Sequence, residues 1–333
     1  MSTTETPTFI SKYKPYFIRD FFLNSDHYLI LNTLFALDDI HLLIVGNPCC
    51  GKTSLLNAII RDYYGLDKNS QFPEHNIMFI NNLKEQGIHF YRNEMKTFCQ
   101  SYSNIYGKKK LIVIDDIDTI NEQSQQVFRN YIDKYSNHVH FISVCTNIQK
   151  VNESLQSRLH IIKMNAIERE HLETTANKII VAEKINICPD AVQFLINISN
   201  NSLRTLINHL EKIYVINRQD DVFDLEKIRA LCSNISYTQF ETYIRLLQGC
   251  DDKTSLFPAI KILYEIYEYG YSVIDIFDYF FQFIKNTELL DETVKYKIIK
   301  SLCKYITIFH KVHEDPIELA FFTMEIQPEF LSR

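Results

Sequence analysis

The sequence predicts an α/β fold in which a parallel sheet, with helices on both faces, is followed by two helical sections. Up to about residue 165, short apolar runs typical of buried strands alternate with helical stretches, which is the pattern of a parallel sheet. A glycine-bounded loop joins the first of these runs to a helix. Beyond residue 165 we find only helical periodicity. We therefore expect an α/β core over 1–165 and helical domains over 166–231 and 232–333.

The same periodicities place the individual elements. Strands are expected at 42–45, 76–81, 111–114 and 140–145, and helices at 26–37, 54–61, 87–100 and 122–135. Residues 1–10 are polar and are expected to fray. No strand is expected from about residue 161 onwards, where the pattern changes.

Residues 42–58 read LLIVGNPCCGKTSLLNA, with the spacing G-x-x-x-x-G-K-T of a phosphate-binding loop between a strand and a helix. Glycine lets backbone N–H groups approach an anion closely, and the helix N-terminus adds partial positive charge behind them. We therefore expect this loop to bind a nucleoside triphosphate. The residues expected to line it are Gly46, Asn47, Pro48, Cys49, Cys50, Gly51, Lys52, Thr53 and Ser54.

Side chains with specific chemistry come from the loop and from a second motif. Lys52 is expected to reach the β- and γ-phosphates, and the Thr53 hydroxyl to be a ligand of Mg²⁺. The second motif, LIVIDDID at 111–118, places Asp115 and Asp116 at the carboxyl end of a buried strand, where parallel sheets bind their ligands. Asp115 is expected to hold Mg²⁺, and Asp116 to be the general base that polarises the attacking water. Together the two motifs predict an ATPase.

Other polar residues are candidates for sensing the nucleotide. Thr146 and Asn147 follow the strand at 140–145, and either can hydrogen-bond the γ-phosphate or the lytic water. Arg158 is interpreted either as a surface charge or as an arginine presented to the nucleotide of a neighbouring subunit. Arg204 begins a helix of the second section, from which it could reach back to the γ-phosphate.

Composition excludes several other classes of protein. No apolar run is long enough for a membrane span, and the N-terminus lacks the pattern of a secretory signal. None of the eight cysteines forms C-x-x-C, so we expect neither zinc nor a disulfide framework, but reduced thiols in an intracellular protein. Cys49 and Cys50 are interpreted as small loop residues, with a redox-sensitive loop as the alternative.

The net charge of −6 argues against nucleic-acid binding over the whole surface but allows a local basic stripe. Basic residues outnumber acidic ones between 81 and 110, where Lys84 and Arg92 are candidates for contacting a DNA backbone without reading its bases. A solvated helix face is the alternative. Lys108–Lys110 are expected in a loop at the edge of the sheet.

Beyond the loop itself, motifs along nearly the whole chain resemble the small subunits of replication factor C, clamp loaders of the AAA+ ATPase family. KYKP at 12–15 resembles the family's K-Y-R-P box, and LIVIDDID resembles its D-E-A-D box. Asn81, Gly87-Ile88 and Arg92 resemble its L-N-A-S-D-x-R-G-I-D-x-V-R segment. QSR at 156–158 resembles its S-R-C motif, and NSLR at 201–204 stands where the family has G-D-x-R.

The resemblance implies a fold, an activity and partners. It implies an AAA+ core with a P-loop and a parallel sheet, a helical lid over 166–231 and an all-helical collar over 232–333. It implies ATP and Mg²⁺ as cofactors and a ring, pentameric in the family, that opens a sliding clamp and loads it on primer–template DNA. The expected location is the nucleus for a eukaryotic source or a viral replication site for a virus.

The resemblance also implies residue roles and exposes one departure. Arg204 would be a sensor in cis, while Arg158 and Arg129 would act on a neighbour's nucleotide. Asp116 stands where the family has glutamate, which shortens the base by one methylene and predicts slow hydrolysis. Two alternatives stay open: a nucleotide-binding structural subunit with little or no ATPase activity, and another AAA+ DNA-processing ATPase such as a helicase loader.

Overall fold

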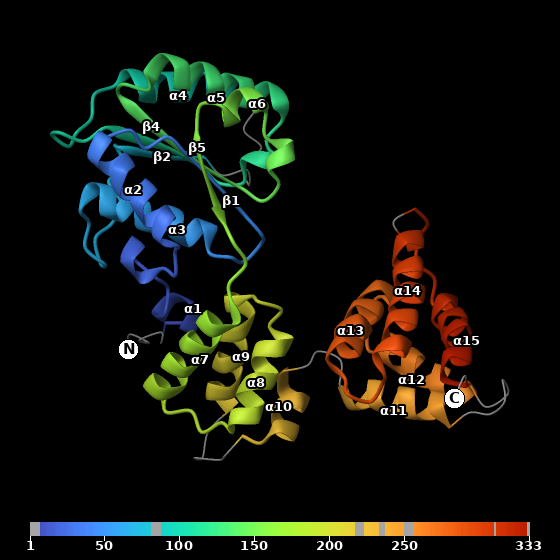
Figure 1. Ribbon diagram of the computed structural model, residues 1–333. Coiled ribbons are helices and arrows are strands. Elements are labelled where there is room, and N and C mark those ends of the chain that lie inside the picture. Colours follow the sequence, from blue (N-terminus) through green and yellow to red (C-terminus); the bar gives the residue numbers. More distant parts are fainter. Residues whose placement is uncertain are drawn as a thin grey trace, which may run out of the picture. The chain divides into compact units, whose positions relative to one another are not determined.

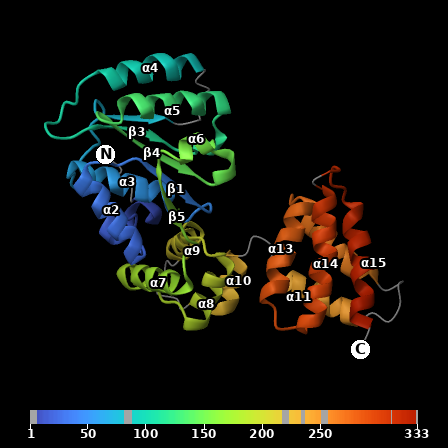
Figure 2. The same cartoon turned by 45° about the horizontal axis from the view of Figure 1, so that its top comes forward.

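The computed structural model describes residues 7–80, 88–216, 223–232, 237–249, 256–309 and 311–331 (Figures 1 and 2). The chain divides into two compact units. One comprises residues 1–179 with 201–208, and the other comprises residues 180–200 with 209–333. None of the helices in the described ranges is long and apolar enough to cross a membrane.

A five-stranded parallel sheet in the order β2-β3-β4-β1-β5 forms the centre of the first unit. Its strands are β1 (Leu42–Gly46), β2 (Ile77–Ile80), β3 (Lys110–Ile114), β4 (Val139–Cys145) and β5 (His160–Met164). The predicted parallel sheet is thereby confirmed. Because β4 lies between β1 and β3, the carboxyl ends of these three strands meet at one edge of the sheet.

The expectation that no strand follows residue 161 is wrong, because β5 pairs with β1 from His160 to Met164. In this edge strand only Ile162 is buried, so the segment lacks the continuous apolar run that marks a central strand. The sequence therefore gives no clear strand signal there, although β5 packs closely on the loop that follows β1.

Helices cover both faces of the sheet because alternate residues of each central strand point to opposite sides. Leu42 and Ile44 pack on one face, against the helices α2 (Ser25–Leu37) and α3 (Lys52–Tyr64). Leu43 and Val45 pack on the other face (Figure 1). Its helices are α4 (Ile88–Gln100), α5 (Glu122–Tyr135) and α6 (Glu153–Gln156).

Two local expectations are corrected. Residues 1–10 are not polar and frayed throughout, because Phe9 begins the short helix α1 (Phe9–Lys12) and is only 5% exposed. Nor do all three lysines 108–110 lie in a loop. Lys110 is the first residue of β3, is buried, and donates through Nζ to the carbonyl of Phe98 and the hydroxyl of Ser101 at the end of α4.

The described residues after β5 are mainly helical, as the periodicity predicted, and they include one isolated parallel bridge between Ile187 and Phe223. Helices α7 to α10 span Arg169–Glu183, Pro189–Ile198, Leu203–Ile216 and Leu225–Cys232. Helices α11 to α15 span Tyr237–Gln248, Phe257–Glu268, Val273–Asn286, Glu292–Phe309 and Ile317–Leu331. The last five helices share one aromatic-rich core, built around residues such as Phe277, Phe280 and Phe322.

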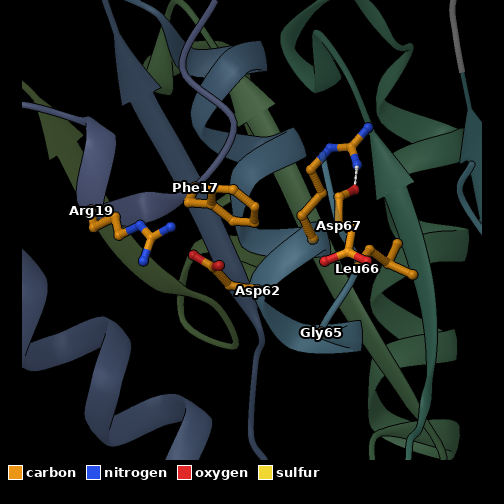
Figure 3. A pocket seen from close by; sticks show the side chains of 7 residues that line it. Phe17, Arg19, Asp62, Gly65, Leu66 and Asp67 are labelled. Atoms are coloured by element: carbon orange, nitrogen blue, oxygen red, sulfur yellow. Dashed lines mark hydrogen bonds between the residues drawn. The ribbon is translucent and has the colours of Figure 1, made fainter. Parts of the chain in front are cut away.

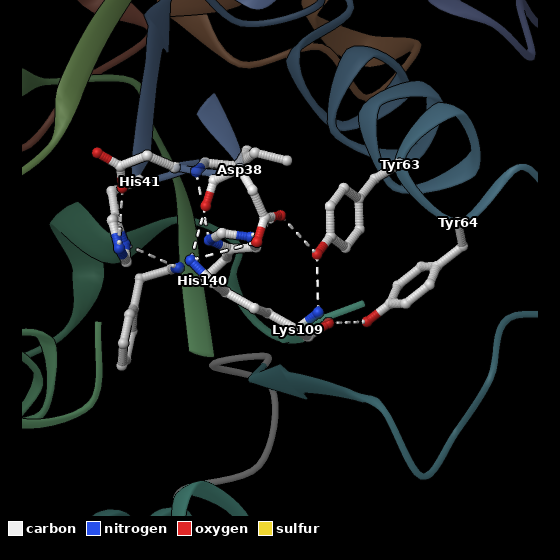
Figure 4. Close-up of polar contacts among 9 residues, drawn as sticks. Asp38, His41, Tyr63, Tyr64, Lys109 and His140 are labelled. Atoms are coloured by element: carbon white, nitrogen blue, oxygen red, sulfur yellow. Dashed lines mark hydrogen bonds and ion pairs between the residues drawn. The ribbon is translucent and has the colours of Figure 1, made fainter. Parts of the chain in front are cut away.

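A polar network around the buried side chains of His140 and Tyr63 links α2 and α3 to the amino ends of β3 and β4 (Figure 4). Asp38, which ends α2 in a left-handed conformation, lies 3.2 Å from Nε2 of His140 in β4 and accepts from the Tyr63 hydroxyl of α3 at 3.1 Å. The backbone N–H of Ile40 donates to Nδ1 of His140, so Nε2 carries the ring proton. The network also holds Lys109, whose N–H donates to the Tyr63 hydroxyl.

We predict that Tyr63→Phe lowers the free energy of unfolding by about 1–3 kcal/mol, because the partly buried N–H of Lys109 loses its acceptor and Asp38 loses a donor. Tyr106→Phe is the control, since that side chain is fully exposed, and it should change stability by no more than about 0.5 kcal/mol. Urea denaturation of both variants measures the difference. Equal stabilities would contradict the structural importance of the network.

We predict that His140 makes stability depend on pH. Burial lowers the pKa of His140 from 6.5 to about 4, so between these values the unfolded chain binds a proton that the folded chain does not. Stability is therefore lost as pH falls through this window, by about 2 kcal/mol between pH 7 and 4.5. In urea titrations at the two pH values, His140→Gln should remove that share of the loss. The same loss in variant and wild type would refute the assignment.

Candidate nucleotide-binding site

The phosphate loop has the backbone that its glycines predicted. Gly51 lies at φ 96° just before α3, in a region that L side chains rarely adopt. The first backbone hydrogen bond of α3 runs from Leu55 N–H to Gly51 C=O. The N–H groups of residues 52–54 precede it and have no acceptor within the helix. These groups form the positive end of α3, which suits an anion.

Gly46 is required for a different reason, which is the closeness of β5. A Cβ atom at this position would lie 2.9 Å from the carbonyl oxygen of Met164 and 2.9 Å from Sγ of Cys50. The loop therefore leaves β1 in contact with the end of β5. Cys50 is buried here, and burial raises the pKa of its thiol, whereas Cys49 is exposed.

The Lys52 side chain lies against the phosphate loop and contacts its backbone. Its Nζ donates to the carbonyl oxygens of Gly46 at 2.9 Å and Asn47 at 2.8 Å, and the residue is only 8% exposed. Its ammonium is thus held at the loop by carbonyl groups. These bonds can be exchanged for phosphate oxygens without moving the lysine out of the site.

Thr53 and Asp115 meet as the strand order requires. The Thr53 hydroxyl lies 3.4 Å from Oδ2 of Asp115, while Oδ1 of Asp115 is buried with no hydrogen-bond partner in the described chain. Burial, and then the charge of Asp116, raise the pKa of Asp115. A hard cation prefers carboxylate and hydroxyl oxygens, and it would relieve both the unpaired oxygen and the repulsion. These two residues therefore fit a magnesium site.

Asp116 is exposed and adopts a left-handed backbone (φ 53°, ψ 52°) at the start of the short helix η2 (Ile117–Thr119). Aspartate is enriched in this region because its short polar side chain tolerates it. The backbone therefore offers a local reason for aspartate at this position, independent of catalysis.

The tips of β3 and β4 are joined by Asp118, a residue that sequence reasoning did not single out. Its Oδ2 accepts from the backbone N–H groups of Thr146 at 3.1 Å and Asn147 at 2.9 Å. The side-chain oxygen of Asn147 accepts from the N–H of Gln149, capping the short helix η3 (Ile148–Lys150). Both predicted sensor residues are exposed and are fixed to η2, which follows β3, through their backbone. Asp118 is the third carboxylate of the LIVIDDID motif, and this position was the sequence signal that could have identified it.

Gln125 was also missed, and its pattern in the sequence gives no warning of its role. This buried side chain of α5 donates through Nε2 to the carbonyls of Ile117, Ile120 and Lys150, and accepts through Oε1 from the N–H of Asn152. It therefore ties α5 to η2 and to the turn before α6. Such a saturated buried amide fixes the backbone around it.

Arg129 of α5 and Arg158, in the turn after α6, lie together on one face of the sheet. The Arg158 guanidinium pairs with Asp133 of α5 and donates to the carbonyl of Ser154 at 2.7 Å. Arg129 lies one turn before Asp133, with Nε 3.7 Å from Oδ2 of the same carboxylate. In the described part of the chain, the hydrogen bonds and ion pairs of these arginines involve no residue of the phosphate loop.

The remaining predicted residues are less well defined. Arg204 is exposed in the first turn of α9, where Ser202 accepts from the N–H of Thr205. Asn201, which precedes α9, has φ 59°. Asparagine tolerates this left-handed conformation better than most residues, which explains how it can stand where the similar family has glycine. Lys84 and the side chain of Arg92 lie outside the described residues.

A cavity of about 360 Å³ lies at the other end of α3, away from the phosphate loop (Figure 3). It is lined by Phe17, Arg19, Arg61, Asp62, Gly65, Leu66 and Asp67. Arg61 donates to the carbonyl of Asp67 at 2.7 Å, so its charge serves the turn after α3. None of the residues predicted to bind nucleotide lines this cavity.

Comparison with known proteins agrees with this geometry. The profile of the "ATPase family associated with various cellular activities (AAA)" matches residues 42–165. Replication factor C subunit 3 of Schizosaccharomyces pombe is 26% identical over 67% of this chain and 64% of that one. Replication factor C subunit 3 of Saccharomyces cerevisiae is 25% identical over 84% and 80%.

A chain of Acanthamoeba polyphaga mimivirus, whose name assigns it to the replication factor C small subunits, is 26% identical over 89% of both chains. Among solved structures, a variant of RuvB from Thermotoga maritima aligns over 72% of this chain and 82% of its own, with a TM-score of 0.51 and 13% identity. That likeness concerns the fold alone. Residues 42–165 therefore match the AAA ATPases, and the chain is similar to replication factor C small subunits over most of its length.

Proposed function

We propose that this chain is a clamp-loader subunit that binds and hydrolyses ATP to open a sliding clamp and load it on primer–template DNA. The observation that carries the proposal is the contact between Thr53 of the phosphate loop and Asp115 at the end of β3. It joins the phosphate-binding and metal-binding halves of an ATPase site. Relatives named as replication factor C subunits over most of the chain support the particular role.

The groups proposed to bind ATP are already in place around the phosphate loop. The N–H groups of residues 52–54 and the Lys52 ammonium would hold the triphosphate, exchanging the carbonyls of Gly46 and Asn47 for phosphate oxygens. Thr53 and Asp115 would hold Mg²⁺, which when bound neutralises charge on the phosphates. The remaining loop residues from Gly46 to Ser54 would enclose the phosphates through their backbone.

The hydrolytic water would be oriented by Asp116 and by Thr146 or Asn147, at the tips of β3 and β4. Asp118 holds the two tips together through hydrogen bonds to Thr146 and Asn147. A displacement of one tip would therefore displace the other. Arg204 would contact the γ-phosphate in cis, whereas Arg158 and Arg129 would stabilise charge on a neighbour's nucleotide. On this proposal a single chain binds ATP but hydrolyses it slowly, because part of the site belongs to the next subunit.

Assembly, location and domain limits are part of the same proposal. The partners would be sister subunits in a ring, a sliding clamp and DNA, with Lys84 and Arg92 contacting the DNA backbone. A lid over 166–231 and a collar over 232–333 would link the ring. The relatives include eukaryotic and viral chains, so the proposed location is the nucleus or a viral replication site.

A nucleotide-binding structural subunit is the second candidate, and Asp116 is the observation that favours it. The exposed aspartate is one methylene shorter than glutamate, so it would leave the attacking water farther from the base. On this reading ATP stabilises the ring and is not hydrolysed at this subunit.

We predict that Lys52→Ala weakens ATP binding by at least about tenfold and abolishes ATP-dependent clamp loading by the assembled complex, because a charge-assisted contact to the phosphates is lost. Titration with a fluorescent ATP analogue measures binding, and retention of the clamp on nicked circular DNA measures loading. Lys68→Ala, an exposed lysine beyond the far end of α3, is the control and should behave as wild type. Unchanged binding and loading by Lys52→Ala would refute the proposal.

We predict that Asp116→Glu raises ATP turnover at this subunit by about 10–100-fold, because the longer side chain brings the base nearer the attacking water. Asp116→Asn should abolish turnover and leave ATP binding intact. Turnover is measured in complexes whose other subunits carry inactivated phosphate loops. If wild type shows none and Asp116→Glu restores it, the structural role is favoured for the natural chain. If all three are equally active, Asp116 is not the base.

A further inference from the structure

Two arginines from different elements converge on one carboxylate. Asp133 in α5 pairs through Oδ1 with Nε of Arg158, which follows α6, and lies 3.7 Å through Oδ2 from Nε of Arg129, one turn earlier in α5. Two positive charges thus share one negative charge. The group keeps a net charge of +1 and retains an attraction for an anion.

The Arg158 guanidinium is oriented by two of its three nitrogens. Nε donates to Asp133, and Nη1 donates to the carbonyl of Ser154 at 2.7 Å and to the hydroxyl of Ser157 at 3.4 Å. Within the described chain, Nη2 donates to no acceptor. A guanidinium held in this way has lost most of its rotational freedom, yet it keeps N–H donors for a planar, bidentate contact with phosphate.

Stability alone does not account for this arrangement. Asp133 is 45% exposed and Arg129 41% exposed, and ion pairs of this kind contribute little to folding because water screens them. Nε of Arg129 is buried and makes no hydrogen bond in the described chain, although it lies near the shared carboxylate. A donor left in this state costs free energy unless a ligand or partner uses it.

We propose that Asp133 is a positioning residue that holds Arg158, and with it Arg129, ready for the phosphates of a nucleotide bound by a neighbouring subunit. The inference rests on the proposed function, since it assumes that these arginines act in trans. Asp133 itself does not touch the nucleotide. It lowers the cost of ordering a long side chain at the moment of reaction, and a misplacement of about 1 Å costs roughly 100-fold in rate.

The test uses the assembled complex, with turnover measured at the phosphate loop that faces this chain. Asp133→Ala removes the acceptor, so kcat should fall by about 10–100-fold, while ATP affinity and the melting temperature of the complex stay near wild type. Asp133→Asn keeps an oxygen that can accept from Nε of Arg158, so it should recover kcat to within about threefold of wild type. Asn130→Ala, an exposed neighbour on α5, is the matched control and should leave kcat unchanged.

Arg158→Ala separates failure of this inference from failure of the proposed function. It should lower kcat at least as much as Asp133→Ala, and the double variant should be no worse than Arg158→Ala, because Asp133 acts through Arg158. If Arg158→Ala lowers kcat but Asp133→Ala does not, the positioning role is refuted alone. If Asp133→Asn is as slow as Asp133→Ala, charge rather than orientation matters, and the inference is also refuted. If Arg158→Ala has no effect, the proposed trans action fails and the inference fails with it.

Discussion

The pairing of β1 with β4, and of β4 with β3, is the constraint on which the rest of the site depends. Residues of these strands are mostly apolar and buried on both faces, and the polar residues Lys52, Asp115 and Thr146 follow their carboxyl ends. Register then decides what meets there: Val45 pairs with Cys145 and Ile114 with Ser143. Thr53 and Asp115 are far apart in sequence, but this register brings them within 3.4 Å.

Most of the fold could be predicted because its signals are local. The apolar runs of β1, β3 and β4 and the spacing of the phosphate loop can be recognised in the sequence without knowing which elements pack together. β5 could not be predicted in the same way, because an edge strand with only Ile162 buried has no continuous apolar run. The motif marks Gly46 as part of a phosphate loop. The steric reason for glycine there includes the contact with Met164 of β5, which the motif does not reveal.

Sequence motifs select a candidate residue when its chemistry depends on residue type and spacing, but they give no signal when a residue's role depends on three-dimensional contacts. Lys52, Thr53 and Asp115 fall in motifs, and the structure brings them to one edge. Asp118 and Gln125 act through backbone groups of distant turns, which no spacing in the sequence reveals. Asp133 is likewise not identifiable from sequence spacing, because its proposed role depends on two arginines that reach it from separate elements.

The central claim is that the ends of β1 and β3 form one site for ATP with Mg²⁺. The most direct test compares ATP affinity with and without Mg²⁺ for wild type and Asp115→Asn, by titration with a fluorescent ATP analogue. Wild type should bind more tightly when Mg²⁺ is present, and Asp115→Asn should lose that gain while still binding ATP through the loop. An equal gain from Mg²⁺ in both proteins would contradict the account.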